Sequence, residues 1–115
     1  MKIMSNNNDD DKYVFKFHDD FWWPIINDIK TSTIRDSSKP VNIHETVTAL
    51  FKPSGNKKEI KITKHYAVRF KDIDNEIAEK EGYLHDDLLK HELRNIYPNL
   101  KDDDYVYIYE FKKLF

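Results

Sequence analysis

The chain has 115 residues, a formal net charge of −2 and no cysteine, and 35% of its residues are charged. This length suits one domain with a core of its own, and the charge balance argues against strong non-specific binding to long nucleic acids, which requires a basic surface. The lack of cysteine excludes disulfides, thiolate nucleophiles and cysteine-ligated metals, and two glycines are too few for a glycine-rich phosphate loop.

The N-terminal segment, residues 1–11, is polar and low in complexity, so we predict a disordered tail followed by one domain over residues 12–115. No apolar run approaches the ~20 residues that span a bilayer. The opening MKIMSNNNDDDK also lacks the apolar centre of a secretory signal. We therefore expect a cytoplasmic protein with no membrane partner.

Hydrophobic periodicity and turn residues divide the rest of the chain into eight elements. The helix nearest the N-terminus is expected to present one apolar stripe, made by Phe21, Ile25 and Ile29. The predicted elements are a strand at 13–17, a helix from Asp19 or Asp20 to Lys30, strands at 31–35, 46–51 and 59–70, helices from Asp72 or Asp74 to Gly82 and from Asp86 or Asp87 to Pro98, and a strand at 105–111.

The resulting order, β-α-β-β-β-α-α-β, is that of a mixed α+β domain. Several short strands with so little glycine favour a small, partly closed barrel. The adjacent Trp22 and Trp23 are expected to pack in the core of this domain.

The stretch KTSTIRD has an unusual polar strand face. Alternation along a strand places Thr31, Thr33 and Arg35 on one side. One interpretation is a solvated face of an antiparallel sheet. The other is a hydroxyl nucleophile activated by an amine, because partial burial and repulsion by Arg35 would favour the neutral form of Lys30. Lys30 and Thr33 have opposite parity in a strand, so they converge only if Lys30 is the junction residue that precedes the strand.

One glutamate of the helix DIDNEIAEKEGY points inward. Ile73, Ile77 and Ala78 define the apolar stripe at ~100° per residue, and Glu81 falls within it. Burial and the negative end of the helix dipole both disfavour an ionised carboxylate at that position. Glu81 is therefore a candidate proton donor, and the alternative is a frayed last turn with Glu81 in solvent.

Four stretches, KTSTIRD, IAEKEG around Glu81, LRNIYP and YVYIYEF, are similar to the ASCH-domain family, and specifically to its small N(4)-acetylcytidine amidohydrolases. The resemblance extends from about Phe17 to Phe111. It implies a PUA-like β-barrel flanked by helices, a nucleoside substrate and no cofactor. It also implies a catalytic set in which Lys30 is the base, Thr33 the nucleophile and Glu81 the proton donor.

The remaining roles in the candidate site stay open. Thr31 and Arg35 are candidates for binding the pyrimidine edge or for supporting the catalytic residues. Arg35 is equally a candidate ion-pair partner of Asp36 or Glu110. The sequence NIHETV lacks the glycine turn that the family has before its third strand, so the pocket wall there is expected to differ.

The main alternative function is a non-catalytic module that binds RNA or nucleotides, because PUA-like barrels bind RNA and fold alone does not decide function. An aromatic strand face and a run of lysines favour it, whereas the acidic net charge does not. The five histidines lack metal-ligand spacing, so no metal site is expected. The aromatic face comprises Tyr105, Tyr107, Tyr109 and Phe111. The lysines are Lys57, Lys58, Lys61 and Lys64. The histidines are His18, His44, His65, His85 and His91.

Overall fold

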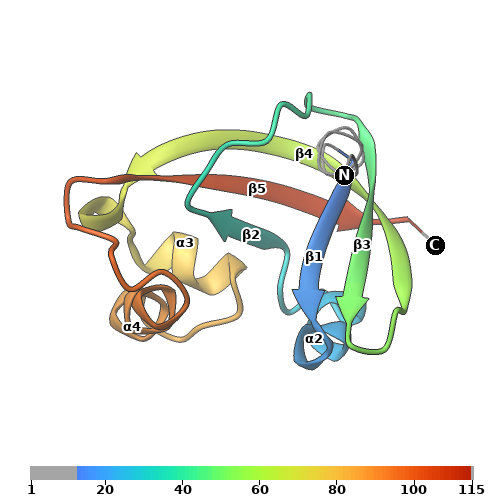
Figure 1. Ribbon diagram of the computed structural model, residues 1–115, viewed down its shortest axis with the longest axis horizontal. Coiled ribbons are helices and arrows are strands. Elements are labelled where there is room, and N and C mark those ends of the chain that lie inside the picture. The colour runs from blue at the N-terminus through green and yellow to red at the C-terminus, as the bar shows by residue number, and fades with distance from the viewer. Residues whose placement is uncertain (1–12, 115) are drawn as a thin grey trace, which may run out of the picture.

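The computed structural model describes residues 13–114, and the predicted N-terminal tail lies outside the described residues. The predicted order of strands and helices is confirmed, with two short 3-10 helices added (Figure 1). The elements in chain order are β1 (Val14–His18), η1 (Asp19–Phe21), α2 (Trp22–Ile26), β2 (Ser32–Arg35), β3 (Thr46–Lys52), β4 (Lys57–Arg69), η2 (Phe70–Asp72), α3 (Asn75–Lys80), α4 (Asp86–Ile96) and β5 (Tyr105–Lys113).

The five strands form one mixed sheet in the order β1-β3-β4-β5-β2, in which only the β1–β3 pair is parallel. The register of β4 against β5 shifts between Ile62 and Lys64, and such a bulge increases local bend and twist. Figure 1 shows β4 and β5 bowed along their length while β1 and β3 stand across one end. The sheet therefore curls into a half-barrel, as predicted, and β1 and β2 are its two edges.

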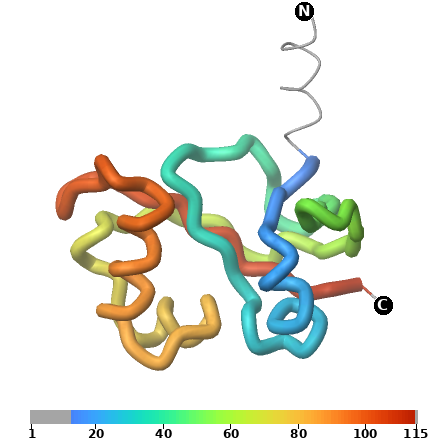
Figure 2. The backbone as a smooth tube through the Cα atoms, turned by 60° about the horizontal axis from the view of Figure 1, so that its bottom comes forward, coloured from blue at the N-terminus to red at the C-terminus, as the bar shows by residue number. Residues whose placement is uncertain are grey.

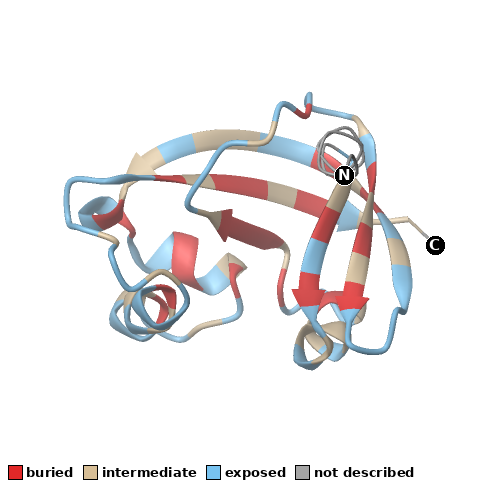
Figure 3. Ribbon diagram, viewed as in Figure 1, coloured by how far each residue is buried: buried red, intermediate tan, exposed pale blue. Residues whose placement is uncertain are grey.

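The half-barrel carries two separate hydrophobic clusters. One lies within the curl of the sheet and includes Phe15, Phe51 and Tyr109, all with no exposed surface. The other lies where α3 and α4 pack on the sheet and includes Phe70 and Leu89. Figure 3 shows buried stretches on β1 and β3 at one end of the molecule and on α3 and α4 at the other. Strand β2 runs between the two clusters, which places its side chains at their boundary.

The predicted helix from Asp19 or Asp20 to Lys30 is wrong in its extent and in its cap. The 3-10 turn is capped by His18, whose Nδ1 accepts from Asp20 N at 3.1 Å. The regular helix ends at Ile26, because Asp28 adopts a left-handed φ of 59° that a helix cannot continue. Ile29, predicted to be in the apolar stripe, is consequently exposed.

Of the two adjacent tryptophans, Trp22 packs against the core and Trp23 lies on the surface. Trp22 packs edge-on against Phe51, with ring centroids 5.0 Å apart. Trp23 is 63% exposed, so its predicted core role is wrong, because this short helix has one buried side only. In α4, Leu89 and Leu93 are buried, whereas Ile96, on the same stripe but at the last residue of the helix, is exposed.

Helix α3 follows the sequence prediction closely. Asp74 is its N-cap and accepts from Ile77 N at 2.9 Å. The inward stripe is buried, and it includes Glu81, which is the C-cap residue. Gly82 follows with a φ of 89°, the left-handed conformation that ends helices at glycine.

We expect Gly82→Ala to lower the free energy of unfolding by about 1 kcal/mol, because a side chain in left-handed backbone is strained. A Cβ there would meet Ile29 O at 3.6 Å, an ordinary contact, so backbone strain is the main term. Chemical denaturation measures the loss. Gly82→Asn is the matched control and should lose less, since asparagine tolerates this conformation. Equal losses for both variants would contradict the assignment to backbone strain.

Candidate functional site

A cavity of about 270 Å³ opens at the boundary between the two hydrophobic clusters. Figure 2 shows the β2 segment passing between the α3–α4 side and the β1–α2 side, and the residues that line the cavity come from both sides. The residues that line it include the three predicted catalytic residues, Lys30, Thr33 and Glu81. The other lining residues are Lys16, Phe17, His18, Phe21, Ile34, Arg35, Tyr83, Leu89, Glu92, Leu93, Ile96 and Tyr97.

Lys30 and Glu81 form a buried ion pair at the base of this cavity. Lys30 Nζ donates to Glu81 Oε1 at 2.8 Å, and the two residues are each only 5% exposed. Lys30 is the junction residue before β2, and its backbone N–H is bonded to Pro24 O. Lys30 therefore precedes the strand, as expected for convergence with Thr33, but its amine is directed to Glu81.

Ser32 completes this network from the other side of the carboxylate. Its hydroxyl donates to Glu81 Oε2, and the residue is buried. Both oxygens of Glu81 are thus satisfied, and a buried carboxylate needs such partners. The sequence reasoning missed Ser32, although its parity with Lys30 in KTSTIRD was an available signal.

Thr33 lies on the opposite face of β2 and is 4% exposed. Its Oγ1 accepts from Arg35 Nε at 3.1 Å, so the predicted shared face of Thr33 and Arg35 is real. Because the arginine donates, the threonine hydroxyl keeps its own proton available to another acceptor. Thr33 and the Lys30–Glu81 pair thus lie on different faces of the strand but on the same cavity.

Arg35 bridges the two edges of the half-barrel. Its Nη2 donates to Lys16 O on β1 at 2.9 Å, while its guanidinium lies over the rings of Phe15 and Phe17 at 5.3 and 5.1 Å. Burial lowers the pKa of Arg35, and Tyr97 and Glu81 partly offset this effect. Within residues 13–114 it makes no ion pair with Asp36 or Glu110; Glu110 instead pairs with Lys80 at 3.2 Å. The ion-pair alternative for Arg35 is therefore wrong.

Two tyrosines that the sequence did not single out also line the cavity. Burial raises the pKa of both Tyr83 and Tyr97. The nearby Arg35 opposes this effect at Tyr97. Both phenols are consequently neutral at physiological pH and can donate hydrogen bonds. Their positions just after a helix end, in EGY and NIYP, are the only sequence signal for them.

Thr31, predicted to share the face of Thr33 and Arg35, instead precedes β2 and does not line the cavity. Its backbone N–H donates to Lys80 O at 2.7 Å, and its side chain makes only a long contact of 3.5 Å with the same oxygen. The backbone hydrogen bond connects the residue before β2 to the last residue of α3. The NIHETV segment, where a different wall was expected, contributes no residue to the cavity lining.

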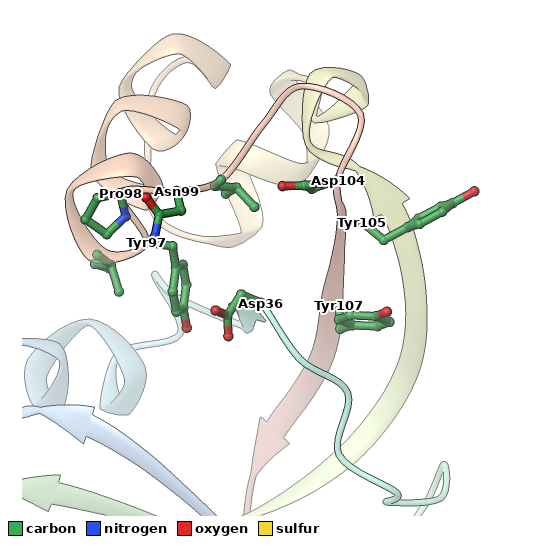
Figure 4. A pocket seen from close by; sticks show the side chains of 9 residues that line it. Asp36, Tyr97, Pro98, Asn99, Asp104, Tyr105 and Tyr107 are labelled. Atoms are coloured by element: carbon green, nitrogen blue, oxygen red, sulfur yellow. The ribbon is translucent and has the colours of Figure 1, made fainter.

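A second and wider cavity of about 560 Å³ adjoins the first, and Ile96 and Tyr97 line both. Figure 4 shows the Asp36 carboxylate between Tyr97 and Tyr107 in its wall. The ionisable side chains that line this second cavity are carboxylates and phenols: Asp36, Asp104, Tyr97, Tyr105 and Tyr107. An anionic ligand is therefore disfavoured there.

The described part of the chain contains no group of three or more histidine or acidic side chains arranged to hold a metal ion. Over the same residues, 13–114, no helix combines the length and apolar character required to cross a membrane.

Known structures share this architecture although sequence comparison finds no relative. No protein-family model and no curated protein matches the chain. The ASCH domain from Lactobacillus crispatus JV V101 superposes with a TM-score of 0.69 at 12% identity, covering 78% of this chain and 67% of its own. This chain has an ASCH-like fold. A DUF984 protein from Enterococcus faecalis V583 is also similar, with a TM-score of 0.71, 15% identity and coverage of 96% and 85%. The ASCH-like, PUA-like fold expected from the sequence is confirmed.

Proposed function

We propose that this ASCH-like domain is an amidohydrolase that removes the acetyl group from N(4)-acetylcytidine and releases cytidine and acetate. One observation carries the proposal: Lys30 and Thr33, which lie close together in the chain, and the distant Glu81 are all buried and line one cavity. Burying a lysine, a glutamate and a threonine together costs free energy that hydrophobic residues would not. Such a cluster beside a cavity is typical of a catalytic site.

The ion pair supplies the acid and the base together. Moving one proton from Lys30 Nζ to Glu81 Oε1, along their 2.8 Å hydrogen bond, gives a neutral amine and a protonated carboxyl. These are the base and the acid that amide cleavage needs. Ser32, which donates to the other carboxylate oxygen, keeps Glu81 oriented during the transfer. The neutral amine then turns from Glu81 towards Thr33.

In the acylation step the Thr33 oxygen bonds to the acetyl carbon while its proton passes to Lys30 Nζ. The bond from that carbon to the exocyclic nitrogen breaks, and the nitrogen takes the electron pair and the proton of Glu81. Cytidine leaves, acetyl-Thr33 remains, and the Lys30–Glu81 ion pair is restored. Arg35 Nε, which donates to Thr33 Oγ1 at 3.1 Å, stabilises the negative charge that develops on this oxygen.

Deacylation repeats the same proton movements with water. Lys30 returns its proton to Glu81 and then accepts a proton from the attacking water. The Thr33 oxygen leaves the acetyl carbon and takes the proton of Glu81. Acetic acid departs and ionises in solvent, so atoms and charges balance.

The direct experiment is incubation of the protein with N(4)-acetylcytidine, with chromatography for cytidine and an enzymatic assay for acetate. We expect the two products in equal amounts. The matched control is Lys80→Met, which removes a partly exposed lysine whose partner is Glu110 rather than Glu81. Cytidine formation no faster than with buffer alone would reject the proposal. The RNA-binding alternative then predicts a gel shift at physiological salt.

A further inference from the structure

We propose that the hydrolase site binds its substrate as a nucleoside 5′-monophosphate, with the phosphate held by Lys16, Arg35 and Lys39. This inference rests on the proposed function and names its substrate class. The three cations and Val14 line a small cavity of about 90 Å³. Lys16 and Arg35 also line the site cavity, so the two spaces adjoin.

The charged groups of Arg35 and Lys39 lie over the same aromatic ring. The Arg35 guanidinium lies 5.3 Å from the centre of the Phe15 ring, and Lys39 Nζ lies 5.2 Å from the same centre. Lys16 is on the neighbouring position of β1, and its backbone oxygen accepts from Arg35. Arg35 and Lys39 are thus held side by side, and Lys16 adds a third cationic residue to the lining of the small cavity, in which Arg35 is a planar donor suited to phosphate.

Within residues 13–114, neither Lys16 nor Arg35 has a carboxylate in direct ion-pair contact, although Glu81 partly offsets the effect of burial on the pKa of Arg35. No carboxylate of these described residues lines the small cavity. A partly buried guanidinium without a directly paired carboxylate is costly, and a bound anion lowers that cost. An anionic group of the ligand is the partner that this arrangement favours.

The chemistry of the nucleotide matches the order of the two cavities. In N(4)-acetylcytidine 5′-monophosphate the acetyl amide and the phosphate lie at opposite ends, with base and ribose between them. Placing the amide at Thr33 and Glu81 directs the phosphate towards the small basic cavity. The wider neighbouring cavity bears Asp36 and Asp104, which repel further phosphates. A mononucleotide therefore fits better than an RNA chain.

The test compares kcat/KM for N(4)-acetylcytidine and for its 5′-monophosphate. We expect the wild type to prefer the monophosphate by about tenfold, and Lys39→Gln to lose most of that preference. Lys39→Gln is informative because Lys39 lines the small cavity only. Lys57→Gln, an exposed lysine outside both cavities, makes the same change in net charge and should keep the ratio. Raising the salt concentration should reduce the preference.

Each outcome separates the inference from the proposed function. Hydrolysis of the nucleoside with no preference for the monophosphate, or a preference that survives Lys39→Gln, overturns the phosphate site alone. Faster reaction on an acetylated RNA oligonucleotide than on the monophosphate overturns the mononucleotide class. If neither compound is hydrolysed, calorimetry with cytidine 5′-monophosphate and cytidine decides. Tighter binding of the phosphate form that depends on Lys39 supports the site, and equal binding rejects it.

Discussion

Lys30→Met should lower the free energy of unfolding by about 3–5 kcal/mol and abolish acetate release. The substitution keeps a long side chain but leaves the Glu81 carboxylate buried without its 2.8 Å partner. Removing one member of a buried ion pair is costly because the remaining charge is neither solvated nor paired. Chemical denaturation and the acetate assay measure the two effects separately.

The double variant Lys30→Met/Glu81→Gln distinguishes stability from catalysis. It removes both charges, and the amide oxygen introduced at position 81 would still accept from Ser32, so most of the lost stability should return. Turnover should not return, because both the proposed base and the proposed acid are missing. The control is Lys80→Met, whose pair with Glu110 is partly exposed and worth about 1 kcal/mol or less. A double variant that regained turnover together with stability would show that the pair is structural only.

Thr33→Val should reduce turnover by about a thousandfold or more while the protein stays folded. Valine keeps the branched shape on β2 and removes only the nucleophilic oxygen. The loss of an acceptor for Arg35 Nε should cost about 1 kcal/mol of stability. The measurement is single-turnover hydrolysis, followed by mass spectrometry for acetyl-Thr33 in the wild type.

Thr33→Ser provides the matched control for this prediction, because it retains a hydroxyl at the same position. We expect measurable turnover from the serine variant and an acetyl adduct on the protein. Turnover of Thr33→Val close to the wild-type value would instead indicate direct attack by water. Arg35 would then be a ligand of substrate rather than a support for the nucleophile.

Local patterns in the sequence predicted the structure correctly where a feature depends on one helix or strand alone. The phase of α3 predicted that Glu81 is buried, because 3.6-residue periodicity depends only on residues close in the chain. The cap at Asp74 and the left-handed Gly82 followed from short-range backbone chemistry. The long helix predicted up to Lys30 failed, because a left-handed turn at Asp28 ends the helical geometry early.

The partners of the polar side chains depend on residues distant in sequence. Lys30 and Glu81 are hydrogen-bonded although they lie 51 positions apart in the sequence. Ser32, the first residue of β2, donates to the other oxygen of the same carboxylate. Arg35 reaches Lys16 O only because the curled sheet brings the edges β1 and β2 together. The parity of Lys30 and Ser32 indicates a shared side, but no spacing within one element identifies Glu81 or Lys16 as the partner.

By itself the sequence determined the α+β class, the order of the elements, the inward glutamate and the shared face of Thr33 and Arg35, since these follow from alternation, helical phase and capping within short segments. The tertiary structure decided that Glu81 is the hydrogen-bond partner of Lys30, that Arg35 donates to Thr33, and that a basic cavity adjoins the site. The physical reason is that buried charges select partners by position in space, and the curl of the sheet sets those positions.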